Sequence, residues 1–184
     1  MTPLRRSALL RIVLLLVALP LFVLGCDTAE DMMFQDDTVF VNADIEVFFR
    51  FDADDFDASG VATVTGDRSF LIDGLLDGSG FDRMDVVSIS GLAGSGELLI
   101  DSPPLAVIDE INQAELSLGG IVAATAQVTM MDDDEDLTVT TNSLNALRNN
   151  PGFDTALRVV LSDPAAAQDY TLEARLTLRF EVQP

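Results

Sequence analysis

Two stretches of strict alternation, one near each end of the chain, constrain its fold more than any other feature. In residues 39–51 the odd positions are apolar and most even positions are polar, whereas in residues 170–182 the even positions are apolar. Because side chains along a β-strand have a period of two, each stretch predicts a long strand with one buried face. The apolar positions are Val39, Val41, Ala43, Ile45, Val47, Phe49 and Phe51, and then Tyr170, Leu172, Ala174, Leu176, Leu178, Phe180 and Val182.

Shorter apolar segments lie between these two stretches, and clusters of Gly, Pro, Asp and Ser separate them. Many short strands with frequent turns favour antiparallel pairing, so we predict an all-β fold, an antiparallel β-sandwich of about eight strands. The short strands are expected at residues 61–65, 86–92, 97–100, 114–118, 121–131, 137–141 and 155–161.

One or two short helical turns are expected within this β-rich chain. Residues 143–149 fit a helix in which Ser143 is the N-cap and Leu144 and Leu147 face inward, ending before a Pro-Gly pair. Residues 71–76 fit a second helical turn.

The first 25 residues have the pattern of a signal peptide. Three arginines, Arg5, Arg6 and Arg11, precede an apolar run over residues 12–24. A spanning helix needs about 20 apolar residues, and this run is shorter. The pattern therefore favours export over a permanent membrane span.

The end of the apolar run, Val23-Leu24-Gly25-Cys26, resembles the lipobox of bacterial lipoproteins. In that class the cysteine is acylated on sulfur, for example with palmitate, and becomes the new N-terminus. Val23 and Leu24 depart from the commonest pattern, which has a leucine and then a small residue. Cys26 is the only cysteine, and a lone thiol in an oxidising compartment favours lipidation. The resemblance implies anchoring to a membrane of the cell envelope, on its periplasmic or surface face.

The domain organisation follows from these segments. We expect a signal peptide over residues 1–25, a lipidated N-terminus with an acidic linker over residues 26–37, and one β-sandwich domain over residues 38–184. Fully extended, residues 27–37 would reach about 35 Å. The domain would therefore stay close to the membrane.

The exported part is strongly acidic. Seven arginines against 31 acidic residues after position 25 give a formal charge of −24, which excludes nucleic acid as a partner. It also argues against adhesion to anionic lipid through a basic surface. The chain has no lysine, and its 23 aspartates outnumber its eight glutamates. This resembles the proteins of salt-accumulating halophiles, so haloadaptation and cation binding both remain open explanations.

The residue types present limit the chemistry. The chain has no histidine, so the usual base for a Ser or Cys nucleophile and the imidazole ligands of zinc are missing. The Gly-rich segment 91–96 lacks the lysine of a phosphate-binding loop and is expected to be a turn between strands. Two carboxylates could cleave a glycoside, but one tyrosine and no tryptophan provide few sugar platforms. We therefore expect that the protein is not an enzyme.

Calcium is the best remaining cofactor hypothesis. Asp55, Asp57 and Ser59, followed by Gly60, match the opening of a calcium loop, which takes oxygen ligands at alternate positions. Gly66 stands where the loop's bidentate glutamate belongs, and strands replace the flanking helices. The alternative is an acidic hairpin turn in which Gly60 has a positive φ. The run Asp132–Asp136 is expected to be a solvated loop.

The sequence thus predicts a non-enzymatic envelope lipoprotein with a structural, adhesive or ligand-binding domain. The alternative is a calcium-dependent, carbohydrate-binding or carbohydrate-active domain. A concave cluster of acids and aromatics would favour this alternative, whereas a smooth sandwich would favour a structural role. The sequence does not indicate which protein or glycan the domain would bind.

Overall fold

The computed structural model of the protein describes residues 38–102, 111–127, 134–139 and 144–183. The predicted signal peptide, the lipobox with Cys26 and the linker lie outside these ranges. No helix within them is long and apolar enough to cross a membrane.

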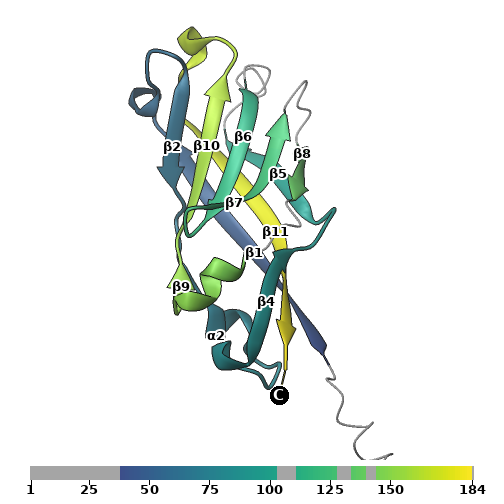
Figure 1. Ribbon diagram of the computed structural model, residues 1–184. Helices are drawn as coiled ribbons and strands as arrows, with labels where there is room; N and C mark the ends of the chain where they lie inside the picture. Colours follow the sequence, from purple (N-terminus) through teal and green to yellow (C-terminus); the bar gives the residue numbers. More distant parts are fainter. Residues whose placement is uncertain (1–37, 103–110, 128–133, 140–143, 184) are drawn as a thin grey trace, which may run out of the picture. The chain divides into compact units, whose positions relative to one another are not determined.

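Nine antiparallel strands form one continuous sheet, which confirms the all-β antiparallel fold. Figure 1 shows that the sheet curls, so that β2, β10 and β6 lie in front of β1 and β11 and the two halves enclose the core. The strand order is β1-β11-β5-β8-β7-β6-β10-β2, with β4 also paired to β11. Their bounds are β1 Val39–Phe51, β2 Val61–Thr65, β4 Val86–Gly91, β5 Gly96–Ser102, β6 Ile111–Leu118, β7 Ile121–Gln127, β8 Asp134–Val139, β10 Thr155–Leu161 and β11 Tyr170–Val182.

The two long strands pair with each other along their whole length, and we call this pair the spine. Its register runs from Val39 opposite Val182 to Phe51 opposite Tyr170. Every even-numbered residue of β11 is buried, as the alternation predicts. In β1 the odd-numbered residues are buried only from Ile45 onward, and Val39 is 37% exposed. The predicted core face of β1 is therefore confirmed for the second half of the strand.

On the other side of β11, β4 and β5 lie one after the other. β4 pairs with Leu178–Val182 and β5 with Thr171–Arg175. The Gly-rich turn between them faces Thr177, whose backbone N–H donates to Ser95 Oγ at 3.0 Å and whose carbonyl accepts from Leu92 at 2.9 Å. The predicted turn is present, and it interrupts what would otherwise be one long strand.

Both predicted helical turns are present but shorter than expected. Helix α2 covers Ile72–Leu75, and residues 145–149 form a 3-10 helix, η4 (Asn145–Asn149), in which Leu147 is buried as predicted. Leu144 is buried and is the residue that precedes η4, whereas the predicted cap, Ser143, lies outside the described residues. Three more 3-10 turns are η1 (Ala53–Asp55), η2 (Arg83–Asp85) and η5 (Pro164–Ala166).

Two expectations about the acidic segments are wrong. The segment between β1 and β2 is not a hairpin, because β1 pairs with β11 and β2 with β10. Part of the run Asp132–Asp136 is not a loop, since its last three residues begin β8 and pair with Leu99, Leu98 and Glu97 of β5. Ladder pairing uses backbone groups, so an acidic composition does not prevent it where a neighbouring strand needs a partner. β8 also pairs with β7 and thereby joins the two halves of the sheet.

A small second sheet is present that the sequence did not predict. β3 (Phe70–Leu71) pairs with β9 (Gly152–Phe153), and two residues are too few to show a periodic pattern. Gly152 is required here, because a Cβ atom at this position would collide with the carbonyl oxygen of Phe70. This ladder forms one wall of a cleft.

Candidate functional site

A cleft of the described domain lies between the β3–β9 ladder and the turn that joins β6 to β7. It has a volume of about 600 Å³, within the usual range of ligand sites. Gly119 and Gly120 form the turn with φ of 54° and 79°, the positive values that a two-residue hairpin loop needs. The Gly119 N–H donates to the Asp154 carbonyl at 2.8 Å, which fixes the turn against the start of β10.

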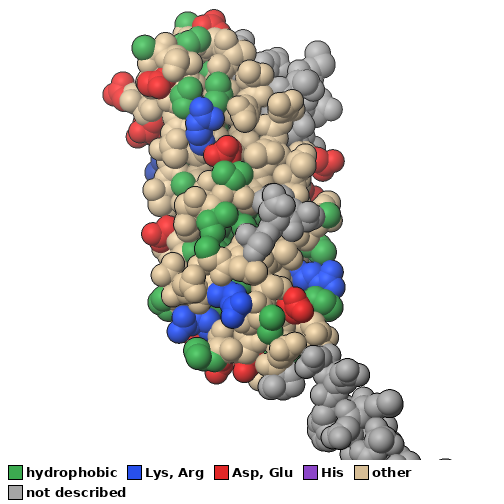
Figure 2. All heavy atoms as spheres, viewed as in Figure 1, with side chains coloured by type: hydrophobic (Ala, Val, Ile, Leu, Met, Phe, Trp, Pro, Cys, Tyr) green, Lys and Arg blue, Asp and Glu red, His purple; other side chains and the backbone are tan. Residues whose placement is uncertain are grey.

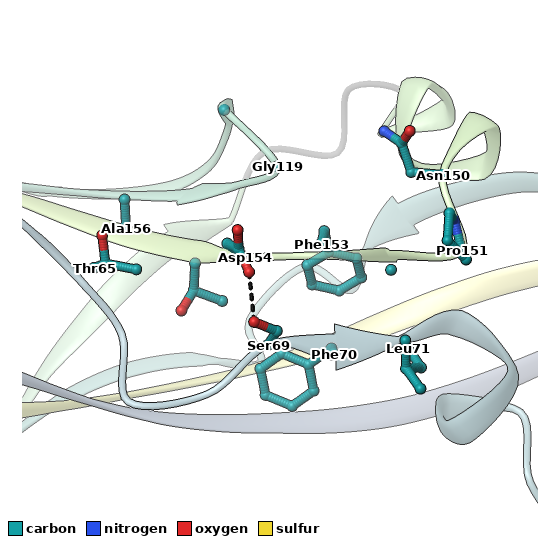
Figure 3. A pocket seen from close by; sticks show the side chains of 13 residues that line it. Thr65, Ser69, Phe70, Leu71, Gly119, Asn150, Pro151, Phe153, Asp154 and Ala156 are labelled. Carbon is teal, nitrogen blue, oxygen red and sulfur yellow. Dashed lines mark hydrogen bonds between the residues drawn. The ribbon is translucent and has the colours of Figure 1, made fainter.

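The apolar wall of the cleft consists of two aromatic rings and an exposed leucine. Phe70 and Phe153 stack with centroids 5.8 Å apart and an interplanar angle of 26°. Phe153 is buried, whereas Leu71, next to Phe70, is 65% exposed. Figure 3 shows both rings below and beside Asp154, with Leu71 and Pro151 farther along the cleft. A ligand could place an apolar face against this wall.

The polar groups of the cleft centre on Asp154. Its Oδ1 accepts a 2.5 Å hydrogen bond from Ser69 Oγ, drawn as a dashed line in Figure 3. Asp154 is the only charged residue among the described residues that line the cleft, and Asn150 adds a carboxamide. Such groups can exchange hydrogen bonds with ligand hydroxyls.

Ser69 and Asp154 do not form the usual serine triad. A serine nucleophile of that kind needs an imidazole between its hydroxyl and the carboxylate, and the chain has no histidine. Ser69 instead donates directly to Asp154. A buried hydroxyl of the cleft lining, Thr155 Oγ1, has no hydrogen-bond partner among the described residues. It lies close to Gly66, on the core side of β10.

The predicted calcium ligands lie just after the last residue of β1, at the end of the spine opposite to Val39. Asp57 Oδ1 accepts from the Ser59 hydroxyl at 2.6 Å, from the Ser59 N–H at 2.8 Å and from the Val61 N–H at 3.1 Å. The Ser59 hydroxyl and these backbone bonds lower the pKa of Asp57. Gly60 has a φ of 75°, as predicted for the turn.

Asp55 is used differently from Asp57. Its carboxylate accepts from the backbone N–H of Asp52 at 2.9 Å, across η1. The structure thus brings Asp57 and Ser59 together and engages Asp55 in a separate turn. No group of three or more acidic residues that could hold a metal is found within the described ranges.

A charged cluster on the outer face of the spine was not predicted. Arg175 of β11 lies 3.9 Å from Glu46 of β1, 3.9 Å from Glu97 of β5 and 2.5 Å from Glu173, as measured from its guanidinium nitrogens. The hydrogen bond to Glu173 is the main cause that raises the pKa of Arg175. The alternation places Glu46 and Arg175 on outward faces, but the register that brings them together is visible only in the paired strands. The cluster thus joins charged side chains of β1, β5 and β11.

Comparisons with known proteins do not identify a family. The chain matches no protein-family model and no curated protein. It is weakly similar to a decameric BFDV capsid protein, with 8% identity, a TM-score of 0.35, and coverage of 78% of this chain and 98% of that chain. The pilus protein of Bacillus endospore appendages gives 13% identity and a TM-score of 0.30, with coverage of 80% and 93%. TM-scores of this size carry no argument about function.

Proposed function

We propose that the chain is an exported lipoprotein, anchored to a cell-envelope membrane through lipid on Cys26, with a non-enzymatic β-sandwich domain. The observation that carries this proposal is the basic and apolar N-terminal segment that ends in Val23-Leu24-Gly25-Cys26. The membrane is the expected partner, reached through the lipid. The domain acts next to it as a structural, adhesive or ligand-binding module.

Metabolic labelling with a fatty-acid probe tests the anchor. The unchanged protein should incorporate the probe, and Cys26→Ser should abolish the label and accumulate as an unprocessed or misplaced precursor. Leu24→Ala is the matched control, because a small residue is the more usual neighbour and labelling should persist. Normal labelling of Cys26→Ser would overturn the lipoprotein assignment.

A carbohydrate-binding function is the second candidate, and the cleft is the observation that favours it. It combines Asp154, Ser69 and Asn150 with an apolar wall at Phe70 and Leu71. Hydroxyl-rich ligands with apolar C–H faces suit such a mixture, whereas anionic ligands do not, since no cationic side chain is found among the described residues that line the cleft. The binding groups would recognise a neutral sugar.

Calorimetric titration with neutral oligosaccharides tests the second candidate. Asp154→Asn should weaken binding about tenfold, the effect expected for the loss of one charge-assisted hydrogen bond. Asp77→Asn, an exposed aspartate on the segment after α2, removes the same charge away from the cleft and should leave binding unchanged. Equal effects of both variants, or no binding by the unchanged protein, would leave the structural role as the better assignment.

A further inference from the structure

The two ends of the spine differ in the side chains that they expose. The first end is where β1 begins: Val39 lies opposite Val182, which lies opposite Val86 of β4, and the Gln183 N–H donates to the Asp85 carbonyl at 3.0 Å. We call it the start end, and it consists of Val39, Phe40, Arg83, Met84, Asp85, Arg179, Glu181 and Val182.

The start end carries most of the exposed large apolar side chains. Five such residues are found among those that the structure describes, and Val39, Phe40 and Met84, which are 37%, 52% and 81% exposed, belong to this end. The guanidinium of Arg179 lies 3.8 Å from the centre of the Phe40 ring. Figure 2 shows basic side chains beside apolar ones towards this end of the domain.

The opposite end, which we call the loop end, consists of residues 52–60 after β1 and residues 162–169 before β11. A hydrogen bond of 2.9 Å from the Ala53 N–H to Asp169 Oδ1 joins the two segments. They contain no arginine or lysine. Their acidic residues are Asp52, Asp54, Asp55, Asp57, Asp163 and Asp169.

We propose that the start end is a lipid-facing surface, in which Phe40 and Met84 enter the headgroup region of the membrane that carries the anchor. This inference rests on the proposed lipid anchor at Cys26. Exposed apolar side chains can lie at the boundary of headgroups and acyl chains, with arginines such as Arg179 extending their charge to the phosphates. The loop end would then face away from the membrane, because residues 52–60 and 162–169 include none of the exposed large apolar side chains.

The length of the tether favours the same orientation. Residues 27–37 reach about 35 Å when extended, whereas a strand of the length of β1 spans about 40 Å. With the spine upright, a tether that joins the domain at Thr38 is too short to hold the loop end at the lipid. The length of the tether and the exposed side chains of the start end therefore point to the same orientation.

The charged side chains near the start end determine whether its binding to a membrane requires anionic lipid. Asp82, Asp85 and Glu181 also lie at or next to the start end, and their carboxylates accept hydrogen bonds from Met84, Asp82 and Ser88. Asp73, which accepts from the Arg83 N–H at 2.8 Å, and Arg148, which donates to the Val87 carbonyl, are also close by. Four acids against three arginines leave no net positive charge for anionic lipid. The attraction is therefore apolar, and it should not require anionic lipid.

Single tryptophans can test the orientation cleanly, because the chain has none. The full lipidated protein would be placed on phosphatidylcholine vesicles that contain brominated lipid. Met84→Trp should show a blue-shifted emission and strong quenching by bromine, whereas Ala165→Trp, an exposed control in η5, should show neither. Both positions are exposed, so the fold should tolerate the change.

Each outcome separates the orientation from the anchor. If the variants do not float with the vesicles, the anchor proposal fails and the orientation fails with it. If they float and tryptophan at position 84 is not quenched, or is quenched no more than tryptophan at position 165, only the orientation is overturned. Addition of phosphatidylglycerol should not increase the quenching at position 84, and a strong increase would contradict the apolar mechanism.

Discussion

The spine and the irregular segments around it are stabilised in different ways. Along the spine, β1 and β11 are each 13 residues long, they pair without a break, and alternate residues fill the core. The cleft wall and the loop end depend instead on single contacts, such as the Gly152 position against Phe70 and the Asp57 turn. The spine is thus stabilised by a pattern of burial that repeats along two strands, whereas each irregular segment depends on a few individual contacts.

This difference implies different sensitivities to mutation. In the spine, the effect of a polar substitution should depend mainly on whether the position faces the core or the solvent. The identity of each buried side chain should matter less, because all buried positions share the same core. In the irregular segments, one added methyl group or one lost acceptor should break a specific contact and leave the core intact. The predictions below test these expectations from the largest effect to the smallest.

The largest effect is expected for Leu176→Asp in the spine. Leu176 is 1% exposed, so the change removes a core side chain and buries an unpaired charge. We expect a loss of at least about 4 kcal/mol in the free energy of unfolding, enough to unfold a marginally stable domain. Urea denaturation followed by circular dichroism would measure it.

The matched control lies one position along, on the outward face. The Thr177 hydroxyl donates to Asp44 at 2.6 Å, and Thr177→Asn retains a donor there. This variant should stay within about 1 kcal/mol of the unchanged domain. If the two substitutions cost the same, the assignment of buried and outward faces in β11 is wrong.

An intermediate effect is expected for Gly152→Ala in the cleft wall. The new Cβ would meet the Phe70 carbonyl, so the β3–β9 ladder must shift, at a cost of about 1–3 kcal/mol. Gly74→Ala in α2 is the control, since its Cβ would be 3.9 Å from the nearest atom and alanine favours helix. We expect a lower melting temperature for the first variant and an equal or higher one for the second. Equal melting temperatures would mean that the small ladder contributes nothing.

The sequence predicted the spine and the fold class because alternation over many residues has few other interpretations. Residues 39–51 and 170–182 match β1 and β11 from end to end, and residues 61–65 and 155–161 match β2 and β10. The cleft could not be predicted in this way. Phe70 and Phe153 are far apart in the chain, and their strands are only two residues long. Gly119 and Gly120 separate the predicted strands at residues 114–118 and 121–131, but nothing local indicates that they lie against Asp154.

The predicted calcium ligands show the reverse case, a local motif whose carboxylates accept hydrogen bonds from the backbone in the structure. Asp55, Asp57 and Ser59 have the spacing of a calcium loop, yet alternate oxygens also suit turns that bind their own backbone. A calcium loop and such a turn differ in what the carboxylates contact. In the structure, the carboxylates of Asp55 and Asp57 contact the backbone N–H groups of Asp52, Ser59 and Val61. Two roles are therefore open to the acids of the loop end, diffuse surface charge and specific calcium binding, and an experiment can separate them.

The smallest effect is expected for calcium. Repulsion among surface carboxylates destabilises the folded state, and any salt relieves it as the Debye length falls to about 3 Å at 1 M. A specific site would instead respond to calcium at millimolar concentration, since ligand stabilisation follows the ratio of free ligand to Kd. We expect the melting temperature of residues 38–184 to rise steadily with sodium chloride, and millimolar calcium to add nothing beyond its ionic strength. A saturable rise with calcium that disappears when Asp55 and Asp57 are both changed to Asn would contradict this expectation, because it would mean that the two carboxylates leave their backbone partners to bind the ion.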